Sequence, residues 1–228
     1  MDAGISGIRA DKRLQAAGRD IRKACGVIVS HDHSDHVRCA GIYQRKFGLP
    51  LHLTSKTLDA SAGQLGKLDD VRCFDAGDML EFGPLAVETV PTRHDAVDGV
   101  AFIIRHKKKR LGILTDLGHV FDGLHEVIHS LDAVFIESNY DPTMLENGPY
   151  PYYLQERIRG PGGHISNGES ADLLSEAAHG RLQWACLAHL SENNNRPSVA
   201  LKTHRRMANG TYTLHAAEYR KASRVFEV

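Results

Sequence analysis

The segment HDHSDH at residues 31–36 constrains this chain more than any other. It directly follows the apolar run GVIVS, which is typical of a buried strand. Alternation along the segment places His31 and His33 on one side. It leaves Asp35 and His36 to reach a second point nearby. Because imidazole is the commonest metal ligand in proteins, the segment predicts a site for two divalent ions rather than a polar loop rich in histidine by chance.

A site for two ions needs more ligands than this segment supplies. His94, Asp116 and His189 each come just past the end of an apolar, strand-sized run. In α/β proteins, ligand-binding residues gather at the carboxyl ends of strands. Any one of the three alone would be interpreted as a hydrogen-bonded loop residue, but together with HDHSDH they predict one metal centre. Nitrogen-rich ligation favours Zn²⁺, and the carboxylates leave Mn²⁺ as the alternative.

Composition supports metal chemistry and excludes several classes of protein. The 14 histidines among 228 residues are a surplus that points to metal or proton chemistry. The 28 Lys and Arg residues balance 28 Asp and Glu residues, which excludes a globally basic nucleic-acid binder but not a local basic patch. We expect no membrane span and no signal peptide, since no apolar run is long enough. The four cysteines form no CxxC pair, which favours a reducing, cytoplasmic location over a disulfide scaffold.

Short apolar runs alternate with longer amphipathic ones, which predicts an α/β fold. No repeat or linker interrupts the pattern, so we expect a single domain over residues 1–228. The expected helices cover 37–47, 122–131, 151–159, 168–179 and 197–208, and the expected strands cover 26–30, 51–54, 85–90, 100–105, 111–115, 133–138, 184–188 and the tail 212–228.

The ligand motifs resemble those of the metallo-β-lactamase superfamily, in the same order along the chain. They are HDHSDH, TRHDAVDG with His94, LTDLG with Asp116 and AHLSENN with His189. Outside the ligands, the motifs DAGIS, ESNYDPTML, NGPYP and GGHISN resemble the YycJ-type branch, which is described as 5′-exonucleases acting on DNA. The resemblance spans nearly the whole chain and implies a four-layer αββα sandwich with the metals at the sheet edge.

Carried over by position, the resemblance assigns a ligand role to all seven residues of the predicted centre. Two such ions lower the pKa of a shared water towards neutrality and polarise a phosphoryl oxygen. Asp35 can also orient the resulting hydroxide or accept its proton. The implied first-metal ligands are His31, His33 and His94, the second-metal ligands are Asp35, His36 and His189, and the bridging ligand is Asp116.

Two further residues resemble a pair in the related tRNase Z enzymes, where a histidine beside a glutamate is thought to protonate the leaving group. His164 in GGHISN and Glu137 in FIESN occupy the corresponding places. His164 also precedes a predicted helix N-terminus, where unpaired backbone N–H groups favour a phosphate. A purely structural hydrogen-bonding role remains open for both residues.

These features predict a metal-dependent phosphodiesterase, most directly a 5′-to-3′ DNA exonuclease that attacks with the metal-bridging hydroxide. Two other activities remain open, those of a small-molecule phosphodiesterase and of a glyoxalase-II-like thioesterase. The thioesterase shares all seven ligands, so the ligands cannot exclude it. The motifs GGHISN and AHLSENN favour the nuclease. A β-lactamase is disfavoured, because Asp116 stands where the common class has a cysteine. A non-catalytic scaffold of this fold is disfavoured as well, since such proteins typically show substituted ligands.

Two stretches could contact DNA but carry a weaker signal. The cationic run RHKKKR at 105–110 is predicted at a hairpin tip, where a solvated turn is the favoured interpretation. Tyrosines and arginines interleave over 150–159, where base stacking and helix packing are equally open.

The family normally places a strand pair before the DAG motif, and here the chain begins at Met1 with that motif. Either the start of the sequence is placed too late or this is a shortened variant. As it stands, the expected fold lacks the first strand pair, which would expose a sheet edge. The histidines outside the ligand positions are expected at the surface, namely His52, His106, His119, His125, His129, His179, His204 and His215.

Overall fold

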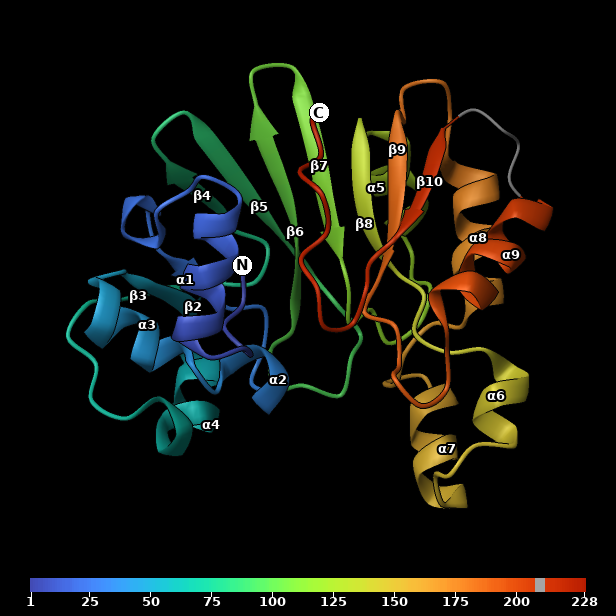
Figure 1. The fold of residues 1–228 in the computed structure, drawn as a ribbon, viewed down its shortest axis with the longest axis horizontal. Coiled ribbons are helices and arrows are strands. Elements are labelled where there is room, and N and C mark those ends of the chain that lie inside the picture. The colour runs from blue at the N-terminus through green and yellow to red at the C-terminus, as the bar shows by residue number, and fades with distance from the viewer. Residues whose placement is uncertain (208–211) are drawn as a thin grey trace. The chain divides into compact units, whose positions relative to one another are not determined.

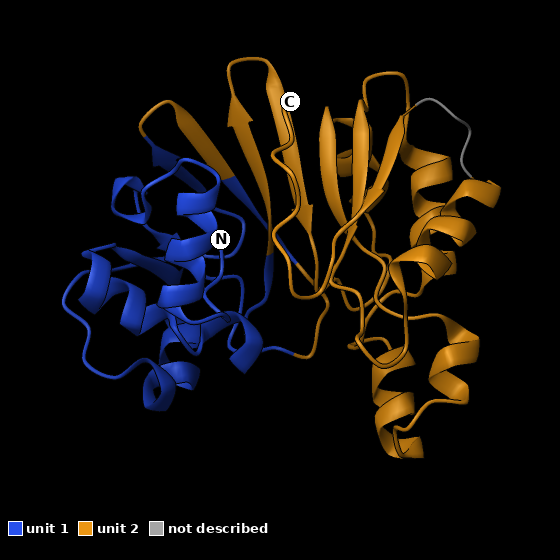
Figure 2. Cartoon of the chain, viewed as in Figure 1, with its two compact units in different colours: residues 1–82, 88–91, 96–100 blue, residues 83–87, 92–95, 101–228 orange. Residues whose placement is uncertain are grey.

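The computed structural model describes residues 1–207 and 212–228, which form two compact units (Figure 2). Unit 1 comprises residues 1–82, 88–91 and 96–100, and unit 2 comprises 83–87, 92–95 and 101–228. The strand β5 (Leu85–Pro91) contributes residues to both units.

Unit 1 contains a three-stranded sheet with the order β1-β2-β3, in which both pairings are parallel (Figure 1). The strands of this sheet are β1 (Val27–Ile28), β2 (Leu51–Thr54) and β3 (Val71–Phe74). Unit 1 also contains β4 (Met79–Phe82), which does not belong to this sheet. Its helices are α1 (Gly7–Ala16), the 3-10 turn Ile21–Lys23, α2 (Ser34–Val37), α3 (Ala40–Phe47) and α4 (Ser55–Leu65).

Local sequence explains these elements. All four residues of β2 are buried, as expected for a parallel strand covered on both faces. Leu51 and Leu53 are fully buried and anchor the core of unit 1. Gly48 ends α3 with a φ of 69°, a left-handed conformation that glycine adopts without steric cost. Thr54 then caps α4, because its side chain accepts a hydrogen bond from the Thr57 N–H at 3.2 Å.

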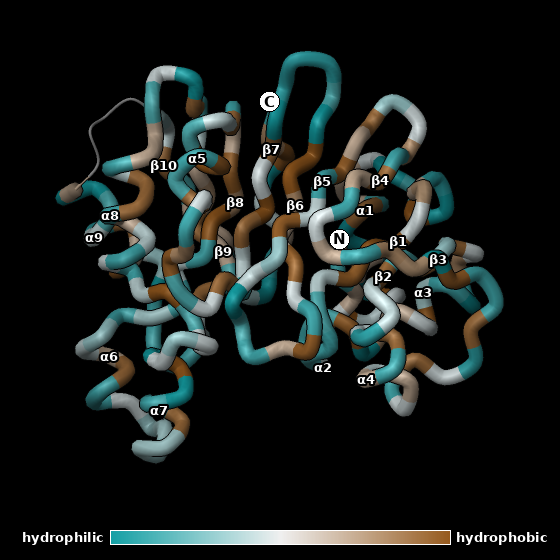
Figure 3. Tube along the Cα trace, turned by 180° about the vertical axis from the view of Figure 1, so that it is seen from behind, coloured by the Kyte–Doolittle hydropathy of each residue, from teal (hydrophilic) through white to brown (hydrophobic). Residues whose placement is uncertain are grey.

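Unit 2 contains a run of strands in the order β10-β9-β8-β7-β6. The pairings are parallel except between β6 and β7, which form an antiparallel hairpin. The middle of these strands is apolar and the β6–β7 turn is polar (Figure 3). The strands are β6 (Val100–His106), β7 (Lys109–Leu114), β8 (Ala133–Glu137), β9 (Trp184–Ala188) and β10 (Thr213–Ala216).

The helices of unit 2 are α5 (Leu124–His129), α6 (Pro142–Glu146), α7 (Tyr152–Arg159), α8 (Asn167–Ala177) and α9 (Pro197–Met207). Ser166 and Glu169 form a capping box at the start of α8, in which each side chain accepts a hydrogen bond from the backbone N–H of the other residue. Among the described residues, none of the helices is long and apolar enough to cross a membrane.

The α/β class is confirmed, and two expectations about single elements are wrong. The helix expected over 37–47 begins earlier, as α2 at Ser34, and is interrupted before α3 starts at Ala40. The tail expected to be strand over 212–228 forms only β10. Its apolar residues pack through side chains instead: the Phe226 ring lies 4.8 Å from that of Trp184, whose Nε1–H donates to the Glu227 carbonyl at 2.7 Å.

The expectation that all non-ligand histidines lie at the surface is also wrong. His52 on β2 is 8% exposed and His204 on α9 is 1% exposed. The strand and the helix each turn that position towards the core, and the His52 ring packs against Phe82 at 4.8 Å. Burial lowers the pKa of His52 and holds the pKa of His204 at about 4, because the charged imidazolium is poorly solvated inside the protein.

Buried His204 predicts a pH-dependent loss of stability. The folded state keeps the ring neutral down to about pH 4, whereas the unfolded chain takes up a proton below 6.5. Between these two pH values the unfolded state therefore binds more protons than the folded state. His204 leaves the free energy of unfolding unchanged above pH 6.5 and lowers it by up to about 3 kcal/mol as the pH falls towards 4. We expect His204→Gln to flatten this loss in urea unfolding curves measured at pH 7 and 4.5.

The exposed His106 provides the matched control, since His106→Gln removes an imidazole without removing a buried one. This control should keep the pH dependence of the wild type. Parallel stability curves for His204→Gln and the wild type would contradict the prediction.

Candidate metal centre

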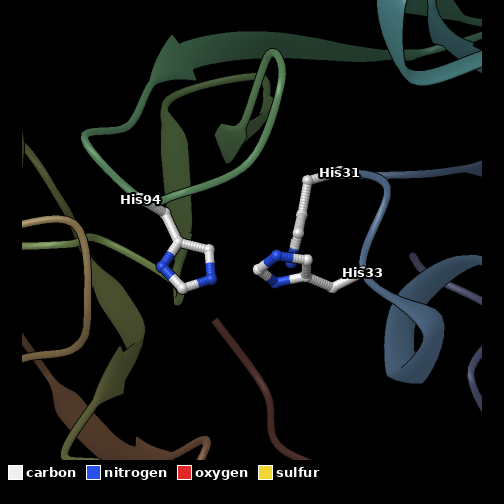
Figure 4. Close-up of side chains that lie close together, drawn as sticks. All are labelled: His31, His33 and His94. Atoms are coloured by element: carbon white, nitrogen blue, oxygen red, sulfur yellow. The ribbon is translucent and has the colours of Figure 1, made fainter. Parts of the chain in front are cut away.

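The loop after β1 and the short helix α2 together carry four of the predicted ligands, all in unit 1. His31 and His33 project from this loop, and their ring centroids lie 4.7 Å apart (Figure 4). The His31 and His36 rings lie 4.2 Å apart, and both side chains are buried. Asp35 is exposed, with its Oδ2 3.5 Å from His36 Nε2. Unit 1 thus gathers the three imidazoles of HDHSDH in one place.

A carboxylate from the start of the chain orients two of these imidazoles. The His36 Nδ1–H donates to Asp2 Oδ2 at 2.9 Å. The Ser30 hydroxyl donates to Asp2 at 3.0 Å and lies 2.9 Å from His31 Nδ1. Because the single hydroxyl proton points at Asp2, Ser30 accepts from His31 Nδ1–H. Both rings are then left with Nε2 as the atom that can bind a metal, which is the usual arrangement of metal-binding histidines.

Asp2 itself is ionised at neutral pH. Burial raises the pKa of Asp2, but the hydrogen bond and charge of His36 and the Ser30 N–H together lower it below its ordinary value. A carboxylate held in this way keeps both rings in the Nδ1–H form.

We therefore expect Asp2→Asn to weaken metal binding by roughly 10- to 100-fold, since substitutions behind a metal ligand typically have this effect. Asparagine tolerates the left-handed backbone at this position, where φ is 53°, so the change removes charge rather than shape. Competition with a Zn²⁺ chelator measures the affinity. Asp59→Asn, at an exposed aspartate of unit 1, should keep the wild-type affinity, and equal affinities for both variants would contradict the role of Asp2.

Unit 2 carries the remaining predicted ligands. The Asp116 Oδ1 lies 3.8 Å from His94 Nε2 and 3.4 Å from His189 Nδ1. Asp116 and His94 are 3% and 8% exposed, so this carboxylate is held between two imidazoles inside the protein. His94 follows β5 in the chain (Figure 4), and its Nδ1–H donates to the Gly163 carbonyl at 2.8 Å. That bond again leaves Nε2 as the metal-binding atom.

The backbone at two of these residues is strained. Asp116 has a φ of 57° and His189 a φ of 52°, in the left-handed region that residues other than glycine rarely adopt. Among the described residues, the only other non-glycine positions with positive φ are Asp2 and Lys107. Two of the four are therefore predicted ligands and a third, Asp2, orients one, as expected where a functional site requires a conformation that the chain alone does not favour.

Glu137 and His164 form a pair, as the resemblance to the tRNase Z enzymes implied. The His164 Nδ1–H donates to Glu137 Oε1 at 2.6 Å, and the Leu117 N–H donates to Oε2 at 3.1 Å. Burial alone raises the pKa of Glu137, but the charges and hydrogen bonds of His164 and His189 outweigh it and hold this pKa well below the usual range. Glu137 is therefore a buried carboxylate at neutral pH, and its partners are imidazoles.

The pair lies directly beside predicted ligands of unit 2. The donor atoms of Asp116, Glu137, His164 and His189 all lie within 4.8 Å of one another. The His164 ring is 4.7 Å from His94 and 5.2 Å from His189. This set of nitrogen and oxygen donors suits a divalent ion such as Zn²⁺, with His164 close enough to act on a group bound there.

The sequence did not identify the residues that hold the ligands in place. These are Asp2 and Ser30 in unit 1, and Gly163 and Asn139 in unit 2, whose Nδ2–H donates to the His189 carbonyl at 2.8 Å. The DAGIS motif contains Asp2, so the requirement for a carboxylate behind a metal-binding histidine could have singled it out. Nothing local marks the other three.

Most of the chain is similar to known proteins. Residues 1–189 match the β-lactamase superfamily domain. The chain is 33% identical over 202 residues to exodeoxyribonuclease YycJ of Bacillus anthracis, covering 88% of this chain and 76% of that protein. It is 32% identical over 207 residues to exodeoxyribonuclease WalJ of Streptococcus pneumoniae serotype 2, covering 89% of this chain and 77% of WalJ.

Among solved structures, the metallo-β-lactamase fold protein YhfI from Bacillus subtilis superposes with a TM-score of 0.66 at 20% identity, covering 87% of this chain and 76% of YhfI. At this identity the likeness speaks for the fold alone. It confirms the metallo-β-lactamase fold that the motifs predicted.

Proposed function

Because this chain belongs to the β-lactamase superfamily and is related along most of its length to the exodeoxyribonucleases YycJ and WalJ, we propose that it is a metal-dependent hydrolase that degrades DNA from an end. The observation that carries the proposal is the hydrogen bond from His164 Nδ1 to Glu137 Oε1, at 2.6 Å. This pair lies beside two predicted metal ligands, Asp116 and His189. A metal-activated water needs a proton donor on the leaving side when the leaving group is a poor one, as a sugar oxygen is.

The proposal includes a dinuclear centre and residues 1–228 as one catalytic domain. Its support is the donor chemistry, the Nδ1 hydrogen bonds that orient His31, His36 and His94, and the family match across residues 1–189. Two divalent ions, Zn²⁺ in the first place and Mn²⁺ as the alternative, supply an activated water and polarise the phosphoryl group. The first ion would be held by His31, His33 and His94, the second by Asp35, His36 and His189, and both by Asp116.

Two residues of the chain carry out the two proton transfers of the reaction, Asp35 on the attacking side and His164 on the leaving side. Asp35, whose carboxylate is exposed beside His36, orients the attacking water and accepts its proton. On the other side, His164 gives its proton to the departing sugar oxygen as the P–O bond breaks. Glu137 positions the His164 ring through its hydrogen bond to Nδ1. For cleavage from the 5′ end, the departing atom is the 3′ oxygen of the terminal nucleotide, and the shortened strand keeps a 5′ phosphate.

Degradation of 5′-phosphorylated DNA labelled at one end or the other tests the proposal. With Mn²⁺ or Zn²⁺ added, we expect a strand labelled at its 5′ end to release labelled mononucleotide at once. A strand labelled at its 3′ end should instead shorten stepwise. The reverse pattern would overturn the 5′-to-3′ polarity. Absence of cleavage by folded protein that binds metal would overturn the nuclease, and hydrolysis of a thioester by that same protein would identify the alternative activity.

A further inference from the structure

The helix α7 presents two tyrosines to solvent. None of its residues is buried, and Tyr152 and Tyr153 are 74% and 75% exposed. The sequence left packing and base stacking equally open for the aromatic residues of this segment, and these exposures exclude packing for both rings within the described structure. Two adjacent exposed rings have a hydration cost that a stacking partner would remove.

The carboxyl end of α7 is joined to the segment that carries His94. The Arg157 Nε–H donates to Asp95 Oδ2 at 2.6 Å, and the Asp95 N–H donates to the Gly162 carbonyl at 2.8 Å. With the bond from His94 to Gly163, three contacts connect the end of α7 to a predicted metal ligand. Helices α6 and α7 accordingly lie beyond the end of the sheet at which β7 ends (Figure 1).

The position of the tyrosines along α7 sets their distance from the carboxyl end of the helix, which the Arg157–Asp95 contact anchors. Tyr152 precedes Arg157 by five residues, which is about 8 Å along a helix. Stacked bases are spaced about 3.4 Å apart, so the rings lie roughly two to three bases from the anchored end. A strand that runs along α7 to its anchored end would therefore pass the tyrosines within a few nucleotides of that end.

Charge on α7 points to bases rather than phosphates as the contacted groups. Arg157 is paired with Asp95, and Arg159 lies 3.4 Å from Glu156. Both cations are thus offset by neighbouring carboxylates. The rings remain as the groups that can recognise nucleic acid, and every base has a face on which a ring can stack.

We propose that Tyr152 and Tyr153 form a stacking platform for the unpaired bases near the end of a single-stranded DNA substrate. This inference rests on the proposed function and adds its substrate class. Paired bases in a duplex are already stacked on their neighbours, so the platform favours single-stranded or frayed ends over blunt duplex.

The test compares the double variant Tyr152→Ala/Tyr153→Ala with the matched variant Tyr152→Phe/Tyr153→Phe. On single-stranded 5′-phosphorylated DNA we expect the alanine variant to raise KM by roughly 10- to 30-fold with kcat unchanged, given the usual contribution of base–ring stacking. The phenylalanine variant keeps its rings and should match the wild type. A strand with abasic residues at its second to fourth positions should be cleaved with the same KM by all three proteins.

Two further readouts separate stacking from other causes. The salt dependence of DNA binding should be the same in all three proteins, because no phosphate contact is removed. Hydrolysis of bis(p-nitrophenyl) phosphate, which has no base, should also be the same, which shows that the centre is intact. Equal KM values for the alanine variant and the wild type on normal DNA would overturn the platform, and so would an effect that persists on the abasic strand. Absence of DNA cleavage by the wild type would instead overturn the proposed function.

Discussion

Replacing Asp116 with asparagine should nearly abolish DNA hydrolysis and reduce the metal content of the protein. Asparagine accepts the left-handed backbone at this position about as well as aspartate, so the variant keeps the fold and loses only the charge. The carboxylate lies within 3.8 Å of His94 Nε2 and 3.4 Å of His189 Nδ1, so its loss affects both imidazoles. Metal ions contribute several kcal/mol to such reactions, which corresponds to roughly a thousandfold loss of kcat/KM.

Elemental analysis of the purified variant and kcat/KM on end-labelled DNA measure the two effects. Asp122→Asn is the matched control, because Asp122 is an exposed carboxylate of the same unit. It should keep the metal content and the rate of the wild type. An Asp116→Asn protein that retained two ions per chain and its full rate would show that Asp116 is no ligand.

Replacing His164 with alanine should have a large effect that depends on the leaving group. If His164 protonates the departing sugar oxygen, its loss should lower kcat on DNA by about 10²- to 10⁴-fold. The p-nitrophenolate ion leaves without a proton, so hydrolysis of bis(p-nitrophenyl) phosphate should fall far less. The two rates, measured on the same preparation, give the comparison directly.

The alternative role for His164 is as a metal ligand, since it lies in a cluster of donors with Asp116, Glu137 and His189. A ligand's removal would lower both rates equally and reduce the metal content. Glu137→Gln offers a second comparison, because it keeps a group that can accept the hydrogen bond from Leu117 N–H but removes the carboxylate that positions His164. We expect Glu137→Gln also to lower the rate on DNA more than the rate on bis(p-nitrophenyl) phosphate, by a smaller factor than His164→Ala does.

Much of the candidate site could be predicted from the sequence because its signals are local. A buried strand followed at once by HDHSDH places three imidazoles within six residues, whatever the rest of the chain does. The apolar runs before Asp116 and His189 likewise predicted that both residues lie where a strand ends. The Glu137–His164 pair joins residues 27 apart, and resemblance to a known family suggested it where spacing could not.

Other features required the tertiary structure, because they depend on which surfaces meet. Asp2 orients His36 from 34 positions away, and nothing in the local pattern indicates that contact. His204 looked like a surface residue of an amphipathic helix, yet it faces the core and loses its basicity there. The tail has the alternation of a strand, but Phe226 packs on Trp184 instead of extending the sheet.

The sequence by itself therefore determined the types of donor, their order and the strand ends that carry them, since those follow from residue chemistry and from periodicity over a few residues. The tertiary structure alone decided which partner orients each donor, which histidines are buried and which tyrosines face solvent. Each of these depends on contacts between segments far apart in the chain, and such contacts form only when the packed faces exclude water together.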